Sequence, residues 1–419
     1  MSSEHPDPSR TSSIADAIDE WVEGNWDLEI TLREWWRRLA DAGYSQPTWP
    51  VGLGGLGVDN RTARTMSDAL AVHGVIAAPT GMGPHMGGPT VLEHGDDAQR
   101  AQIRAVADGR EAWCQLFSEP EAGSDLAGVK AIAVRDGDDY VVTGQKVWNS
   151  SADLADRGML LARTDPSAPK HAGLSFFLID MRQPGIEARP LRTMNGSAQF
   201  CEVFLDGARA KATDVIGGLG NGWKVASTML GHERRMAASG SSRSLFTVNA
   251  GQLGGNLDRT VADVVAEARE RAAHKPVAMI NSAKMLIALA QQFGVNTDPT
   301  FRDELARYYI RGEVYRLTNL RARASRTPGP EASIAKIGLS GMARASRDLG
   351  LRIVGAGGML VGAEAASEGR VQYAALSTPG VSLGGGTDEI QHNVIGERAL
   401  GLPREPFPAS GAPTERTTP

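Results

Sequence analysis

Cysteine, clustered histidine and long apolar runs are all scarce in this chain. Its 419 residues include two cysteines, Cys114 and Cys201, too few for a disulfide framework and typical of a reducing compartment. The eight histidines never cluster at the spacing of metal ligands, and we therefore expect no metal site. No stretch approaches the roughly 18 consecutive apolar residues of a spanning helix, so we expect no membrane span.

An excess of charge of one sign is also lacking. The 44 lysines and arginines face 49 aspartates and glutamates, and a net charge of −5 offers no electrostatic footprint for nucleic acid or an anionic membrane. The first residues, MSSEHPDPSRTSS, lack the apolar segment of a signal peptide, and we expect a cytoplasmic protein. Glycine, in contrast, is abundant at 49 residues, and part of this excess lies in a few tight clusters.

The hydrophobic pattern changes twice along the chain. Leu32, Trp35, Trp36 and Leu39 stand at i, i+3, i+4 and i+7, which predicts a helix in the first segment. Short β-type runs separated by turn residues follow, and the helical period then returns. Within Arg302–Leu320 the apolar residues fall on two sides, as expected for a helix packed inside a bundle.

These changes predict an α+β chain with three domains between two loose tails. We expect an N-terminal helical domain over 14–112, a small central β domain over 113–216 and a C-terminal helical bundle over 222–402. Residues 1–13 and 406–419 are polar and contain several prolines, which is typical of flexible tails.

One glycine pattern is a poor indicator of function. Gly52–Gly57 matches G-x-G-x-x-G literally, but the dinucleotide-binding fingerprint requires a preceding strand. The preceding residues Gln46–Pro50 contain two prolines and cannot form a central strand. A glycine-rich turn is therefore the favoured interpretation.

Three other stretches rich in glycine and hydroxyl groups enter regular structure: Trp113–Asp125, Gly144–Ser151 and Leu383–Gln391. Glycine allows the backbone to approach a ligand closely, and exposed N–H groups hold anions. The third stretch runs into a predicted helix, whose N-terminus favours negative charge. Taken alone, these stretches are compatible with a phosphate-bearing cofactor or with ordinary caps and turns.

Together the motifs resemble the acyl-CoA dehydrogenase family over nearly the whole chain. Five elements in order carry the resemblance: Thr48–Gly55 (P-x-x-x-G-G), Ser118–Asp125 (S-E-P-x-A-G-S-D, with Glu121 where glycine is usual), Lys146–Trp148 (K-x-W), Gly355–Gly358 (a G-G-N-G-like turn) and Gly384–Pro403 (G-T-x-E-I-Q and its G-L-P tail). The resemblance implies a helical domain, a central β domain and a C-terminal four-helix bundle, usually in a tetramer.

The resemblance also implies FAD between the β domain and the bundle. Ser118 and Ser150 are expected near the flavin N5/O4 edge, and Trp148 on the ring, although Trp148 taken alone is equally a core aromatic. The remaining cofactor residues implied are Gly123 and Ser124 on the pantetheine side, Thr387 and Glu389 at the phosphate or ribityl groups, and Gly355 and Gly357 on the adenine side.

The position of the catalytic base departs from many members. They carry a glutamate where this chain has Gly385, whereas a second branch carries it on the first helix after the β domain. Glu233, with Arg234 beside it, resembles that placement, which is similar to isovaleryl-CoA dehydrogenase and to actinobacterial fatty-acyl and steroid side-chain dehydrogenases. Without the family, Glu233 is a solvent-facing or loosely paired helix residue.

The reaction implied is oxidation of an acyl-CoA thioester to the trans-2-enoyl-CoA. Glu233 removes the α-proton, the β-hydrogen passes as hydride to flavin N5, and the backbone N–H of Gly385 stabilises the enolate oxygen. An electron-transferring flavoprotein is the implied acceptor. Glycine at 385 is also expected to leave room for a branched or bulky acyl group.

Alternatives stay open because of a second departure. Members often carry R-x-x-F-G in the bundle, with the arginine reaching a neighbouring FAD pyrophosphate, and Ala290 stands in its place here; Arg302 or a partner chain is the candidate substitute. The chain is therefore a homo-oligomer or part of a heterotetramer with a related subunit. A half-site partner subunit and a flavin oxidase or monooxygenase on the same fold are the alternatives. Straight, branched and steroid-type acyl groups are equally compatible with the sequence.

Overall fold

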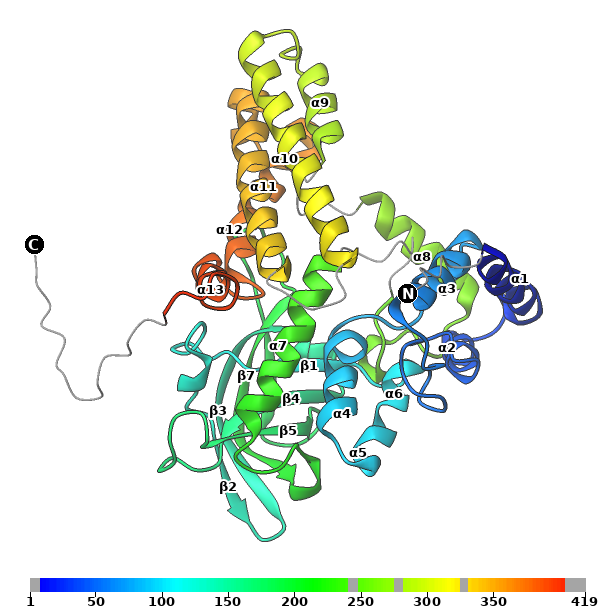
Figure 1. Cartoon of the computed structure of the whole chain (residues 1–419), viewed down its shortest axis with the longest axis vertical. Helices are drawn as coiled ribbons and strands as arrows, with labels where there is room; N and C mark the ends of the chain where they lie inside the picture. Colours follow the sequence, from blue (N-terminus) through cyan, green and yellow to red (C-terminus); the bar gives the residue numbers. More distant parts are fainter. Residues whose placement is uncertain (1–7, 240–247, 275–281, 325–330, 404–419) are drawn as a thin grey trace, which may run out of the picture. The chain divides into compact units, whose positions relative to one another are not determined.

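The computed structural model describes residues 8–239, 248–274, 282–324 and 331–403 (Figure 1). By their contacts they belong to two compact units, Met1–Ala278 and Met279–Pro419. The helices of the first unit are α1 (Pro8–Asn25), α2 (Leu32–Asp41), α3 (Asn60–Val72), α4 (Gly88–His94), α5 (Asp97–Gln102), α6 (Arg104–Ala107), α7 (Gly222–Ser239) and α8 (Val261–His274). Thus α7 and α8, which the sequence assigns to the C-terminal bundle, pack within the first unit.

The N-terminal helices follow from the predicted apolar stripe. Leu32, Trp35, Trp36 and Leu39 are all buried in α2, which confirms the helix predicted from their spacing. Thr31 caps α2 because its hydroxyl accepts a hydrogen bond from the N–H of the third helical residue. The first helix begins at Pro8, so part of the segment predicted to be a tail is helical.

The central sheet has eight strands: β1 (Trp113–Leu116), β2 (Ile132–Asp136), β3 (Asp139–Ser150), β4 (Arg157–Arg163), β5 (Leu174–Asp180), β6 (Ile186–Leu191), β7 (Phe200–Lys211) and β8 (Val215–Ile216). Their order is β6-β7-β3-β2-β4-β5-β8, with β1 parallel to β4. Nearly every residue of β4 and β5 is buried, because side chains cover both faces there, and this explains their continuous apolar sequences.

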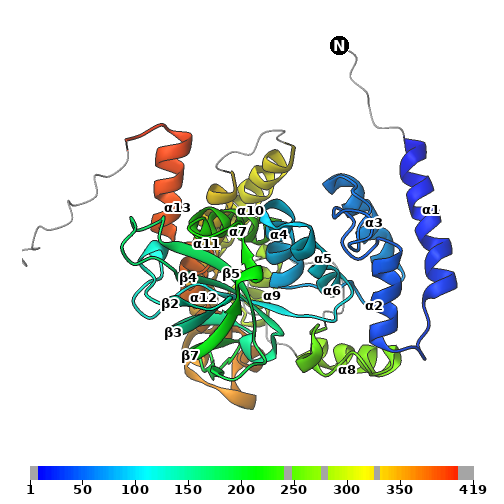
Figure 2. The same cartoon turned by 90° about the horizontal axis from the view of Figure 1, so that it is seen from below.

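Helices α4 and α7 lie side by side on one face of this sheet (Figures 1 and 2). Val225, Ala226 and Met229 of α7 are fully buried in the cluster that joins the helices to this face. A separate apolar cluster on the other face contains both cysteines, which are free, as the sequence predicts.

The second unit consists of α9 (Ala283–Gln292), α10 (Pro299–Ala324), α11 (Glu331–Val354), α12 (Arg370–Leu383) and α13 (Asp388–Val394). On α10, Leu305 and Tyr308 are buried in the core of this unit. The other apolar side is exposed in the single chain, with Ile310 at 59% and Val314 at 58%, so within the described residues α10 packs through one of its two apolar sides. No helix in the described residues is both long and apolar enough to cross a membrane.

Candidate active site

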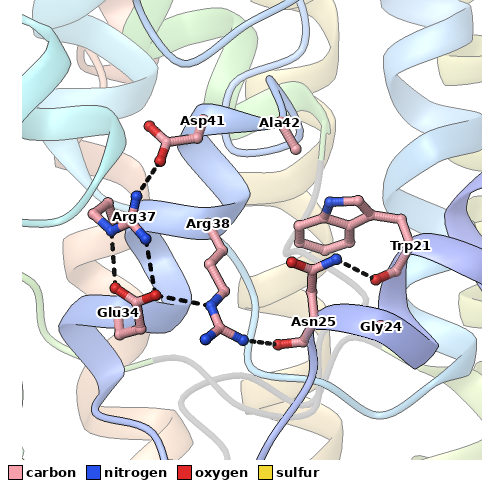
Figure 3. A pocket seen from close by; sticks show the side chains of 8 residues that line it. All are labelled: Trp21, Gly24, Asn25, Glu34, Arg37, Arg38, Asp41 and Ala42. Carbon is pink, nitrogen blue, oxygen red and sulfur yellow. Dashed lines mark hydrogen bonds and ion pairs between the residues drawn. The ribbon is translucent and has the colours of Figure 1, made fainter.

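A polar cleft of about 550 Å³ between α1 and α2 contains none of the predicted site residues (Figure 3). Its charged groups satisfy one another: Arg37 and Arg38 both donate to the Glu34 carboxylate, at 2.8 and 2.9 Å. The Arg38 guanidinium also donates to the backbone carbonyl of Asn25. The cleft therefore stabilises the helix pair and offers no unpaired group to a ligand.

The predicted flavin-facing tryptophan lies in a bulge between β3 and β7. The register of this pair shifts by one residue between Lys146 and Asn149, and Trp148 adopts a left-handed φ of 64° there. Its indole is 59% exposed and meets Phe200 edge to face at 5.9 Å between ring centroids. Trp148 is thus no core aromatic, and the bulge presents a flat apolar surface outward.

A buried ion pair joins the first two motif stretches. Lys146 is fully buried, and its Nζ donates to Glu119 Oε1 at 2.8 Å and to the carbonyls of Phe117 and Leu161. Burial lowers the pKa of Lys146 to about 8, although Glu119 works in the opposite direction. The Lys146 ammonium group is therefore paired inside the protein. Lys146 holds the loop after β1 against β3.

This pair places the two candidate flavin-edge serines on adjacent segments. The Val147 N–H donates to the Ser118 carbonyl at 2.9 Å, so Ser118 lies beside the bulge that carries Trp148. Ser118 and Ser150 are both half-buried, whereas Gly123 and Ser124 are exposed on the loop that follows β1. The structure thus brings Ser118, Trp148 and Ser150 together at one end of β3.

A buried polar atom next to these serines has no partner. Asn149 Nδ2 donates to the Gln115 carbonyl at 2.6 Å, which ties β3 to β1. Within the described part of the chain, however, the buried Asn149 Oδ1 finds no hydrogen-bond partner. Buried polar groups in native proteins are normally paired, so an acceptor left open here fits the polar edge of a bound group. With the exposed indole and the two serines beside it, this edge fits a flavin.

Glu233 lies on α7 and faces the sheet. The residue is half-buried. Burial raises the pKa of its carboxyl group, and a hydrogen bond from the Gln115 amide and the charge of Arg234 offset part of this rise. A loosely paired surface glutamate does not have these surroundings. A carboxylate whose pKa is raised by a dry environment is instead suited to accept a proton from carbon.

Gln115 is a site residue that the sequence reasoning missed. Gln115 lies on β1, on the same face of the sheet as Trp113 and as Phe117, which directly follows the strand. Both aromatic residues are buried beneath the helices. A polar residue between two core aromatics was the available signal, since such a position needs a partner. Only the packing of α7 across β1 identifies that partner as Glu233.

The C-terminal glycine segment is anchored within the second unit. Asp388 is buried and accepts from Lys336 at 2.8 Å and from Arg344 at 2.7 Å. Burial alone would raise the pKa of Asp388, but the hydrogen bonds from Lys336 and Arg344 outweigh it and hold the pKa well below its usual range. Gln391 Nε2 donates to the Gly385 carbonyl at 3.0 Å, which fixes the turn before α13.

The predicted cofactor residues of this unit occupy turns. Thr387 caps α13 by accepting from the Ile390 N–H, and Glu389 is exposed in the first turn. A Cβ added at Gly385 would meet no atom within 4 Å, although a φ of 68° favours glycine there. The turn at Gly355 and Gly357 is held by Gln372, which donates to the Gly357 carbonyl at 2.9 Å.

The position of the absent arginine is a core position. Ala290 is fully buried on α9, among the residues that join α9, α10 and α11. An arginine in its place would have to displace apolar neighbours in this chain. Arg302, the substitute considered from the sequence, is exposed near the start of α10.

The structure thus combines a mostly antiparallel β module between helical segments with a half-buried carboxylate on the helix that crosses it. Three family models match the chain: the acyl-CoA dehydrogenase N-terminal domain over residues 11–109, the middle domain over 114–208 and the C-terminal domain over 278–400. The chain therefore belongs to the acyl-CoA dehydrogenase family of flavin-dependent oxidoreductases.

Particular relatives come from actinobacteria. The chain is 33% identical to acyl-CoA dehydrogenase IpdE1 of Mycobacterium tuberculosis over 89% of its own length and 88% of that protein. It is 34% identical to FadE34 of the same organism over 87% of its length, but that match spans only 46% of FadE34.

Solved structures agree on the fold. The ChsE4–ChsE5 complex from M. tuberculosis matches with a TM-score of 0.64 and 26% identity, over 96% of this chain and 100% of that one. A steroid acyl-CoA dehydrogenase, Tcur3481–Tcur3483, matches with a TM-score of 0.67 and 24% identity over 95% of this chain and 99% of the other, and it supports the fold alone.

Proposed function

We propose that this protein binds FAD and oxidises an acyl-CoA thioester to the trans-2-enoyl-CoA, with Glu233 as the base. One observation carries the proposal: Glu233 is the carboxylate that α7 places against β1, where burial raises its pKa and Gln115 faces it. Ser118, Trp148 and Ser150 lie on neighbouring segments of the same unit. Base and flavin-edge candidates are thus parts of one folded unit.

We assign the following roles to residues of this chain. Glu233 takes the α-proton, and its dry surroundings strengthen it as a base once it is ionised. Ser118 and Ser150 would hydrogen-bond the flavin edge, Trp148 would cover the ring, and Gly123 and Ser124 would line the pantetheine side. Arg234 keeps the carboxylate of Glu233 oriented. The flavin, when bound, supplies the acceptor for the β-hydrogen, which leaves the substrate as hydride.

For residues of the second unit, the proposal follows the resemblance to the family alone. The N–H of Gly385 stabilises the developing enolate oxygen, and the Asp388 contacts with Lys336 and Arg344 keep that turn rigid. Thr387 and Glu389 would hold the phosphate or ribityl part of FAD, and Gly355 and Gly357 would line the adenine side. An electron-transferring flavoprotein would be the electron acceptor.

The test is an absorption spectrum of the purified protein followed by anaerobic titration with straight-chain, branched and ring-bearing acyl-CoAs. We expect bound yellow flavin that one class of thioester bleaches, and no bleaching in Glu233→Gln, because a neutral amide cannot take the α-proton. A flavin-loaded protein that Glu233→Gln bleaches at the wild-type rate contradicts the role of Glu233. Oxygen consumption during turnover would instead indicate an oxidase or monooxygenase.

A second candidate function is that of a partner subunit that completes a heterotetramer. Ala290 favours this function, because it stands where many members carry the arginine that reaches a neighbouring pyrophosphate. Its burial leaves no room for a longer side chain there. The 26% identical relative in the ChsE4–ChsE5 structure is itself part of a two-protein complex. A colourless, inert protein that gains flavin only with a related subunit would favour this function.

A further inference from the structure

A polar face of α7 lies next to the proposed base and is not used by the proposed mechanism. Thr228, His232 and Arg235 recur at helical spacing on this face. Across from Thr228 lies α4, where His94 Nε2 and Thr228 Oγ1 are 2.9 Å apart and the Glu93 carboxylate lies 3.4 Å from the same hydroxyl. A polar contact thus joins two helices that otherwise pack through apolar side chains.

The tautomer of His232 follows from its contact with Arg235. A guanidinium nitrogen of Arg235 lies 2.7 Å from His232 Nδ1. Because a guanidinium only donates, Nδ1 is the acceptor and the proton of the neutral ring sits on Nε2. Burial, followed by the charge of Arg235, lowers the pKa of His232 to about 4, against the opposing effect of Glu93. The ring is therefore neutral near neutral pH and presents Nε2–H as a donor.

That donor has no acceptor. His232 Nε2 is buried, and no hydrogen-bond partner for it exists in the part of the chain that the structure describes. A buried N–H without an acceptor lowers the stability of the folded chain, and an acceptor on a bound molecule would remove this cost. The ring as a whole is only half-buried, so its surroundings are not closed on every side.

The position of this donor connects it to the substrate. His232 directly precedes Glu233, and consecutive side chains on a helix diverge by about 100°. The donor therefore lies beside the base, on the side of α7 that faces α4. An acyl chain whose α-carbon reaches Glu233 and that extends toward α4 would run along this face.

We propose that His232 Nε2–H donates to an oxygen atom on the acyl chain, so that the preferred substrate is an acyl-CoA bearing a ketone, hydroxyl or carboxylate oxygen beyond its β-carbon. This inference rests on the proposed dehydrogenase function. Arg235 fixes the donor by holding Nδ1, and the exposed end of its guanidinium favours an electron-rich ligand group. A purely hydrocarbon chain would leave the donor unpaired.

The experiment compares matched thioesters in the flavin-loaded protein. The probes are octanoyl-CoA, 8-hydroxyoctanoyl-CoA and suberoyl-CoA, together with 3-cyclohexylpropanoyl-CoA and its 4-oxo derivative. For the wild type we expect kcat/KM to be about tenfold higher for at least one oxygenated probe than for its hydrocarbon counterpart. His232→Leu should remove this ratio, and His232→Gln, which keeps an N–H donor, should retain part of it.

Two controls separate the outcomes. His73→Leu removes a histidine that pairs with Asp19 at the surface of the same unit, and it should leave the ratio unchanged. His232→Leu removes the unpaired donor together with the hydrogen bond that Nδ1 accepts from the exposed Arg235, so the melting temperature should change little. An equal ratio in His232→Leu and the wild type, or no oxygenated preference in the wild type, overturns the inference. If no acyl-CoA reduces the flavin at all, the proposed function fails instead.

Discussion

Lys146 and Glu119 form an ion pair across 2.8 Å in which the lysine side chain is 0% and the glutamate side chain 7% exposed. They come from the two motif stretches that carry Trp148 and Ser118. Glu119 Oε1 also accepts from the backbone N–H of Ala131, and Glu119 Oε2 accepts from the backbone N–H of Lys130. The pair thus serves to fix the loop between β1 and β2.

Breaking this pair should destabilise the protein strongly. Lys146→Met leaves a buried carboxylate without its counterion, and we expect the free energy of unfolding to fall by about 3–5 kcal/mol. Urea unfolding followed by tryptophan fluorescence measures it. Lys130→Met is the matched control, since Lys130 pairs with Glu121 at the surface and its loss should change little. Similar stabilities of the two variants would show that the buried pair is not structural.

The acid limb of activity should report the environment of Glu233. Burial raises the pKa of this carboxyl group above 4.5, so kcat/KM should rise with pH around a midpoint above that value. Gln115→Leu removes a hydrogen bond that lowers the pKa, and it should move the midpoint to higher pH. The control is Gln145→Leu, whose amide bonds Glu202 elsewhere on the sheet. A midpoint that stays in place in Gln115→Leu would contradict the contact.

The ionised carboxylate of Glu233 should lower the free energy of unfolding at neutral pH. Because the pKa of Glu233 is higher in the folded than in the unfolded chain, the folded chain binds more protons between 4.5 and that raised value. Stability therefore falls as pH rises through this window, and Glu233→Gln should raise the melting temperature at pH 8 but not at pH 4. Differential scanning calorimetry at both pH values tests this, with exposed Glu20→Gln as the control. An equal effect at both pH values would exclude the linkage.

Trp148 should matter for the cofactor and little for the fold. Its indole is 59% exposed, so Trp148→Ala should leave the melting temperature of the flavin-free protein nearly unchanged. The dissociation constant for FAD should rise about tenfold, since the ring loses an aromatic contact. Flavin fluorescence titration measures the constant, and Trp148→Phe should keep much of the affinity. A large loss of stability without a change in FAD affinity would assign Trp148 to the core after all.

Features that depend on neighbours along the chain could be predicted from the amino-acid sequence. The spacing of Trp35 and Trp36 predicts α2 because a helix repeats every 3.6 residues, and the apolar run of β5 predicts a buried strand for the same kind of local reason. The helix after Thr387 follows from its capping hydroxyl. Resemblance to a family then identified Glu233 as the candidate base.

Whether a site residue is shielded from water, hydrogen-bonded or unpaired depends on the tertiary structure. Gln115 and Glu233 lie more than a hundred positions apart, and only the packing of α7 over β1 brings them together. The exposure of Trp148 depends on a bulge in the pairing of β3 with β7. The unpaired Nε2–H of His232 depends on the tautomer that the contact with Arg235 fixes. Local periodicity cannot predict such features, because the free energy of a polar or charged group depends on the side chains that replace water around it.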